Sequence, residues 1–220
     1  MFIGHFAVAL AAKRAAPEVP LGTLFLAAQL ADLVWPTLVL LGLESFSIRP
    51  GITAVTPLDF TRYPYSHSLV ALAAWGTALG IAYFLTRRRW WEALVLLAVV
   101  LSHWVLDFVT HRPDLPLTIT GAERFGLGLW HTRLATLAVE GLLFAACVWI
   151  YVRVTRPVDR TARWSLSAFV VFLVLVYIAN IFGPPPPSVA AVAWSAQAIW
   201  LLVAWGYWID RHRISSIAGR

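Results

Sequence analysis

The stretch RRRWWEALVLLAVVLSHWVLDFVTHR, residues 87–112, decides the fold class of this chain. Three arginines precede a mostly apolar run over 90–109, and a bilayer core about 30 Å thick is crossed by roughly 20 apolar residues in a helix. The same run carries His103 and Asp107, four residues apart, and His111 follows after four more. Residues four apart lie on nearly the same face of a helix. The stretch therefore predicts a transmembrane helix that carries polar groups on one side.

Composition extends this interpretation to the whole chain. The 220 residues are 60% hydrophobic and 13% charged, whereas soluble domains average about 45–50% apolar and about 25% charged residues. The net charge of +6 is best explained by arginines that anchor helices at the membrane surface, so no nucleic-acid partner is expected. The single Cys147 excludes an intrachain disulfide. The first apolar run has its charges after it, which favours a retained segment over a cleaved signal peptide.

The hydrophobic pattern predicts an all-α fold, a polytopic transmembrane bundle of about seven helices in one integral membrane domain, 1–220. The candidate spans cover 21–43, 66–86, 90–109, 128–152, 164–182 and 189–209. A shorter apolar segment over 2–14 precedes them, and its length suits a tilted or half-membrane helix. Gly76 and Gly80 have the small-residue spacing that lets helices pack closely.

Basic residues alternate along the chain and predict its orientation. They follow the first, third, fifth and seventh apolar segments, as Lys13, Arg14, Arg87, Arg88, Arg89, Arg153, Arg156, Arg160, Arg163, Arg211, Arg213 and Arg220. The intervening loops hold few basic residues. Because arginine-rich loops stay in the cytoplasm, we expect the N-terminus outside, or buried from the outer side, and the C-terminus in the cytoplasm.

Ionisable residues inside the predicted spans indicate a functional site. The set comprises His5, Asp32, His67, His103, Asp107, His131 and Glu140. At 1.5 Å per residue, His5 and Asp32 lie about 12 and 15 Å deep from the cytoplasmic side, and His103 and Asp107 about 20 and 25 Å. Ionisable groups at such depths are rare and usually functional. Imidazoles and carboxylates without matching buried lysine or arginine form a ligand set that suits zinc, manganese or iron.

Each of these residues also has a simpler interpretation. His5 alone could be a core histidine bonded to a backbone carbonyl, and His67 could cap a helix. His103 and Asp107 could form a structural hydrogen bond, and His111, just before Arg112-Pro113, could be a loop residue. Asp32 is harder to explain without a partner, because an unpaired carboxylate in a span is costly. His212, in the basic tail, is expected to be a solvated surface residue.

The order of these motifs resembles that of a known family. An early His5, then Asp32, then His67-Ser68, then Ser102-His103 with Asp107, Thr110 and Pro113 is similar to the bacterial inner-membrane metal-dependent hydrolases, described as LexA-binding putative hydrolases. The order also resembles, more distantly, the zinc-dependent phospholipase C family. The resemblance covers about residues 1–118, and 164–209 adds two further helices.

The resemblance implies a metal-dependent hydrolase of the bacterial inner membrane that acts on a phosphoester or a lipid-like substrate at the outer face. It implies one or two divalent ions, most simply zinc, which lowers the pKa of a coordinated water to about 7. Asp32, His67, His103 and Asp107 would hold one ion, and His5 with Asp107 a second. His103 and Asp107 are the expected catalytic residues, and His111 and His131 are further candidate ligands. Membrane lipid is the expected partner.

Two other classes of function stay open from the residues alone. A metal-stabilised membrane subunit without turnover needs the same ligands, and a metal or proton transporter uses a chain of histidines and carboxylates as its pathway. A transporter needs aqueous openings on both faces, whereas the cytoplasmic halves of the predicted spans are almost wholly apolar. Four arginines expected on the outer side are candidates to hold an anionic substrate, namely Arg62, Arg112, Arg124 and Arg133.

Overall fold

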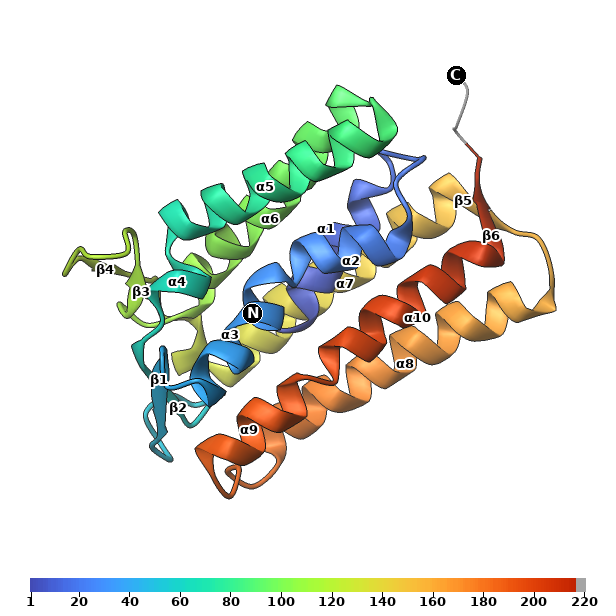
Figure 1. The fold of residues 1–220 in the computed structure, drawn as a ribbon. Coiled ribbons are helices and arrows are strands. Elements are labelled where there is room, and N and C mark those ends of the chain that lie inside the picture. Colours follow the sequence, from blue (N-terminus) through green and yellow to red (C-terminus); the bar gives the residue numbers. More distant parts are fainter. Residues whose placement is uncertain (217–220) are drawn as a thin grey trace.

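The computed structural model describes residues 1–216, and most of the chain is helical (Figure 1). The helices are α1 (Ile3–Ala12), α2 (Leu21–Ala28), α3 (Leu30–Leu40), α4 (Pro64–His67), α5 (Leu69–Arg87), α6 (Trp90–Thr110), α7 (Arg133–Val154), α8 (Arg160–Phe182), α9 (Val189–Ala196) and α10 (Ile199–Arg211), with a 3-10 helix η1 at Leu129–His131. Side chains in the flanking residue cap three of them: Ser68 caps α5, Asp159 caps α8 and Ser188 caps α9.

Within the described residues, five helical segments are long and apolar enough to cross a membrane. They are Leu69–Arg87, Trp90–Thr110, Arg133–Val154, Arg160–Phe182 and Val189–Arg211, the last of which contains α9 and α10. The pair α2 and α3 would make a sixth span, bent by 55°. The prediction of a helical protein with membrane-length apolar segments is therefore confirmed.

The predicted continuous span 21–43 is instead two helices. α2 ends at Ala28, and Gln29, with φ −100° and ψ 9°, separates it from α3. A break of this kind leaves carbonyls of the preceding turn without a helical partner. Irregular backbone at membrane depth is tolerated where protein groups satisfy it. The carbonyl of Ala28 accepts a hydrogen bond from the imidazole of His103, so the break is joined to one of the candidate ligands.

The short helix α1 lies in the core of the bundle. Its ten residues span about 15 Å at 1.5 Å per residue, half of a bilayer core. Phe6, Ala7, Ala9 and Leu10 are completely buried, and α1 packs against α2, α6, α7 and α8. A helix that is apolar all round needs such an enclosed position. The first turn also holds a buried polar residue, His5, which points into the site described below.

Glycines bring two helix pairs close together. A Cβ atom on Gly206 of α10 would lie 2.5 Å from the ring of Phe25 and 3.0 Å from the Cα of Gly22, both in α2. A Cβ on Gly80 of α5 would lie 3.1 Å from the carbonyl oxygen of Ala93 in α6. These contacts leave no space for a methyl group unless the neighbouring helix moves. The predicted role of Gly80 in close helix packing agrees with this geometry.

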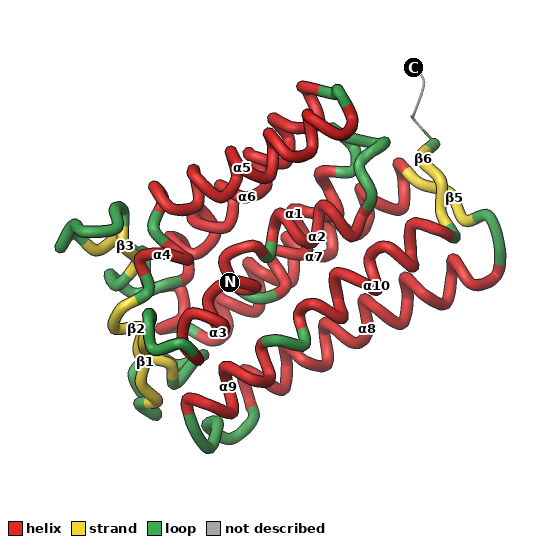
Figure 2. Tube along the Cα trace, viewed as in Figure 1, coloured by secondary structure: helices red, strands yellow, loops and turns green. Residues whose placement is uncertain are grey.

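Among residues 1–216, three short antiparallel strand pairs lie outside the helices, and the sequence did not predict them. They are β1 (Ser45–Ile48) with β2 (Leu58–Arg62), β3 (Leu115–Pro116) with β4 (Arg124–Phe125), and β5 (Thr155–Pro157) with β6 (Arg213–Ser215). The first two pairs lie at one end of the bundle, and β5 and β6 at the other, where α5 also turns into α6 (Figures 1 and 2). The arginine-rich connections therefore share one end. Arg220 lies outside the described residues.

Candidate metal centre

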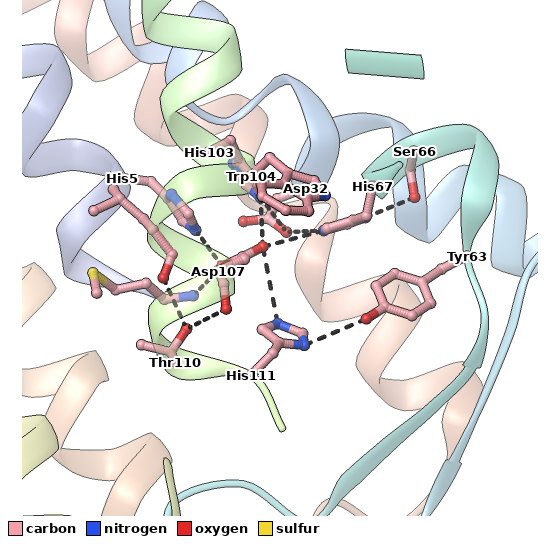
Figure 3. A network of polar contacts seen from close by, with 12 residues as sticks. His5, Asp32, Tyr63, Ser66, His67, His103, Trp104, Asp107, Thr110 and His111 are labelled. Carbon is pink, nitrogen blue, oxygen red and sulfur yellow. Dashed lines mark hydrogen bonds and ion pairs between the residues drawn. The ribbon is translucent and has the colours of Figure 1, made fainter. Parts of the chain in front are cut away.

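A cluster of histidine and aspartate side chains lies between α1, α3, α4 and α6 (Figure 3). α6 contributes His103 and Asp107, and His111 follows directly at its C-terminal cap. α1 contributes His5, α3 contributes Asp32, and α4 contributes His67. The structure thus brings together all five residues expected to bind metal, from helices far apart in the sequence, together with one of the two further candidates.

Asp107 is the centre of the cluster. Its Oδ1 lies 3.1 Å from His5 Nε2, and its Oδ2 lies 3.2 Å from His103 Nε2. The same Oδ2 is 3.9 Å from His111 Nε2 and 4.0 Å from His67 Nε2. The two carboxylate oxygens therefore face different histidines, which is the arrangement that a bridging carboxylate needs.

Asp32 reaches the cluster from α3. Its Oδ1 lies 3.4 Å from His67 Nε2 and 3.9 Å from His103 Nε2. Ligand atoms of Asp32, His67 and His103 lie within 4.8 Å of one another, and so do those of His5, His103 and Asp107. Two atoms bound at 2.0–2.2 Å to one tetrahedral zinc ion are roughly 3.3–3.6 Å apart. The observed separations are close to that range, so the two groups could each hold a metal ion.

Hydrogen bonds on the far side of the imidazoles turn the Nε2 atoms inward. His103 Nδ1 donates to the carbonyl of Ala28 at 2.8 Å, and His111 Nδ1 donates to Asp114 Oδ1 at 2.9 Å. A neutral imidazole that donates from Nδ1 has its lone pair on Nε2. Metal-binding histidines are generally oriented by such a bond to a carbonyl or carboxylate.

Two buried nitrogen atoms in the cluster have no hydrogen-bond partner among the described residues. These are Nε2 of His103 and Nδ1 of His5. Their rings stack in parallel, with centroids 3.7 Å apart and planes within 2°. Burying a polar atom without a partner is costly, and a metal ion at Nε2 of His103 would supply the partner. The donor set and this unpaired atom both fit a divalent cation.

The cluster is almost closed to solvent. The side chains of His5, His67, His103 and Asp107 are 1–5% exposed, whereas that of Asp32 is 27% exposed. Asp32 is therefore the most exposed of the five candidate ligands.

A second layer of polar residues, which sequence reasoning missed, surrounds His111. Asp114 accepts hydrogen bonds from His111 and, at 3.0 Å, from the Tyr63 hydroxyl. Burial, and then the charge of Asp114, raises the pKa of the Tyr63 phenol well above its ordinary value, so Tyr63 stays a donor. Arg112 binds Asp114 through Nε at 2.9 Å and also pairs with Asp59 in β2. The position of Asp114, three residues after His111, was the available signal.

The amino end of α1 also reaches the cluster. The Met1 amino group contacts Asp107 Oδ1, and Glu140 of α7 accepts a hydrogen bond from the Phe2 amide at 3.1 Å. Glu140 was singled out in the sequence as an ionisable residue within a span. Its contact with the start of α1 places it beside the cluster, where it helps to hold the helix that carries His5.

The remaining candidates lie elsewhere or have other partners. His131 is exposed at the end of η1 and belongs to neither ligand group. Arg133 donates to the carbonyl of Ala54, and Arg112 is paired with carboxylates, so neither is a free anion-binding group. His212 is not simply solvated, because its Nδ1 lies 2.6 Å from Asp159 Oδ2. This bond holds the pKa of Asp159 below its ordinary value.

The fold and the site together define a class: a helical protein with membrane-length apolar helices and a buried group of histidines and aspartates that could hold metal ions. Comparisons with family models, curated proteins and solved structures gave no match for this chain.

Proposed function

We propose that this protein is a membrane-embedded, metal-dependent hydrolase of the bacterial inner membrane that acts on a phosphoester or lipid-like substrate. The observation that carries the proposal is the convergence of His5, Asp32, His67, His103 and Asp107 from four helices, with no hydrogen bond to Nε2 of His103 among the described residues. The proposal places the chain with the metal-dependent hydrolases that its motifs resemble.

The ligand geometry supports a particular division of roles. Asp32, His67, His103 and Asp107 would hold one divalent ion, most simply zinc, and His5 with Asp107 a second. A bound ion of this kind lowers the pKa of a coordinated water and polarises a phosphoryl oxygen. Asp107 presents one oxygen to each ligand group, and the hydrogen bond to Ala28 keeps the His103 ring oriented toward Asp107. Asp32, the most exposed of these ligands, would face incoming water and substrate.

The position of the site along the bundle supports a substrate at the outer face. His103 is 13 residues beyond Trp90, about 20 Å along the helix axis, and the arginine-rich connections lie at the Trp90 end (Figure 1). With those connections in the cytoplasm, the C-terminus lies in the cytoplasm and the site lies in the outer half of a bundle of about seven helices. The N-terminus is then buried from the outer side, beside Asp107.

One observation favours a second candidate function, a metal-stabilised membrane subunit without turnover. Four of the five ligand side chains are 1–5% exposed, and closed metal sites are typically structural, whereas catalytic sites keep an open position. The 27% exposure of Asp32 is the feature that favours catalysis.

Metal analysis combined with a hydrolysis assay tests the proposal and separates the two candidates. The protein purified in detergent should contain zinc or another divalent metal by elemental analysis and should hydrolyse the phosphodiester bis(p-nitrophenyl) phosphate. His103→Ala should lose both the metal and the activity, and the matched His212→Ala should lose neither. Bound metal without hydrolysis would favour the structural subunit, and wild-type protein without metal would refute both.

A further inference from the structure

A buried chain of three residues continues outward from the metal centre at His67. The Nδ1 of His67 lies 2.7 Å from the Ser66 hydroxyl oxygen, and that hydroxyl donates to Glu44 Oε2 at 2.6 Å. Glu44 and Ser66 are 2% and 0% exposed. Glu44 belongs to the connection between α3 and β1 and lies 22 residues before Ser66.

The other contacts of Glu44 determine how its carboxylate is oriented. Its Oε1 accepts hydrogen bonds from the backbone amides of Tyr65 at 2.7 Å and Ser66 at 2.9 Å. These three donors hold the carboxylate as an acceptor on both oxygens, which is what a buried carboxylate without a cationic partner requires. Oε2 is therefore fixed opposite the Ser66 hydroxyl.

The direction of each hydrogen bond then follows from the donors available. A serine hydroxyl has one hydrogen, and that hydrogen goes to Glu44. The Ser66 oxygen is left as an acceptor, so Nδ1 of His67 is the atom that carries the ring proton. The unprotonated Nε2 then faces Asp32 at 3.4 Å and Asp107 at 4.0 Å. The Ser66 hydroxyl alone could either donate to Nδ1 of His67 or accept from it. The carboxylate of Glu44 takes the hydroxyl hydrogen, so Ser66 can only accept from Nδ1.

We propose that Glu44 is a positioning residue that selects the metal-binding tautomer of His67 through Ser66. The inference rests on the proposed metal site, but the tautomer can be measured without a metal. It differs from the bonds of His103 and His111, which donate directly to an oxygen that can only accept. Of these three histidines, His67 is the one whose tautomer depends on a residue, Glu44, that is two hydrogen bonds away.

The substitution Glu44→Gln isolates this role. The two backbone amides require an acceptor at Oε1, so the glutamine amide nitrogen takes the place of Oε2 and donates to Ser66. The Ser66 hydroxyl must then donate to Nδ1 of His67, which moves the ring proton to Nε2 and blocks the ligand atom. An aspartate-to-asparagine change that leaves the geometry intact but imposes the wrong histidine tautomer has the same logic in serine proteases.

The control is Glu92→Gln at the opposite end of α6. Glu92 is a glutamate of similar burial, 5% exposed, and accepts a hydroxyl hydrogen bond from Tyr83 at 2.6 Å. It lies 11 residues before His103, about 16 Å along the helix. The control therefore makes the same chemical change without touching the site.

The first measurement is nuclear magnetic resonance of the imidazole nitrogens in metal-free, histidine-labelled protein at about pH 8.5, where an ordinary imidazole is neutral. The signal missing from His67→Gln identifies His67. Wild type and Glu92→Gln should show the proton on Nδ1 of His67, and Glu44→Gln should show it on Nε2. The same protonated nitrogen in wild type and Glu44→Gln would overturn the proposal.

The second measurement is zinc affinity by competition with a chelating dye. Glu44→Gln should bind zinc about 10–100-fold more weakly than wild type, the usual cost of losing an outer-shell partner, whereas Glu92→Gln should match wild type. Unchanged affinity in Glu44→Gln would count against the relay. A wild-type protein that binds neither zinc nor another divalent metal would refute the proposed function, and the tautomer measurement would still decide the role of Glu44.

Discussion

With zinc bound at the proposed site, Asp107→Asn should abolish most of the stabilisation that zinc binding would provide. The Oδ2 atom of Asp107 lies 3.2, 3.9 and 4.0 Å from the Nε2 atoms of His103, His111 and His67, and Oδ1 lies 3.1 Å from that of His5. Asparagine has the same shape but only one oxygen. Whichever way its amide turns, the nitrogen faces one of the two ligand groups, where it cannot bind a cation.

The size of the effect follows from the mass action of ligand binding. Zinc at 100 times its dissociation constant stabilises the folded state by about 2.7 kcal/mol. If the substitution weakens binding about 100-fold, the upper end of the cost for an outer-shell partner, the same zinc concentration contributes only about 0.4 kcal/mol. The difference of about 2.3 kcal/mol corresponds to roughly 5–9 °C in Tm for a chain of this length.

Thermal unfolding in detergent, with and without zinc, measures this effect. The comparison is the zinc-dependent shift in Tm, so a change in the baseline stability of the variant cancels. Asp210→Asn is the control, because Asp210 pairs with Lys13 at 2.8 Å and makes no contact with the cluster among the described residues. An Asp107→Asn protein that gains as much Tm from zinc as wild type does would refute the assignment of Asp107 as a ligand.

Three further predictions concern packing, pH and topology. Gly206→Ala should lower the free energy of unfolding by about 1–3 kcal/mol, because the new methyl group overlaps α2. Gly141→Ala, with no atom within 4 Å of the new Cβ, should raise the free energy of unfolding by up to about 1 kcal/mol. Denaturant titration measures both values, and equal effects would contradict the close packing of α10 against α2. The pKa of Asp159 is lowered by its partner His212, so the stabilisation from this bond is present above the unfolded pKa and is lost as pH falls through the folded pKa. The Tm difference between wild type and Asp159→Asn should therefore shrink on acidification. A difference that stays constant with pH would count against a stabilising bond between Asp159 and His212. In a chain without its native cysteine, a cysteine at Ser47 should react with an impermeant thiol reagent in intact cells and one at Arg88 only after lysis, and the reverse pattern would overturn the orientation.

The membrane-length helices were predictable because their signal is local. The expected run 90–109 and the observed Trp90–Thr110 agree closely, since the arginines before it and the length of apolar sequence mark its ends. The break at Gln29 was not predictable from the same pattern. Apolar residues continue on both sides of Gln29, and the interruption is stabilised by the imidazole of His103, which binds the carbonyl of Ala28 from 75 residues further along the chain.

The sequence by itself determined which residue types the site contains and on which segments they lie, because ionisable groups stand out in apolar runs. Only the tertiary structure decided which of them meet. His111 and His131 were equal candidates in the sequence, yet the first faces Asp107 and the second is exposed. Glu44 and Tyr63 carried no signal, because their roles depend on hydrogen bonds that form once the connections fold over the helix ends. Helix formation follows from neighbours along the chain, whereas the orientation of an imidazole follows from whatever atom the fold places beside it.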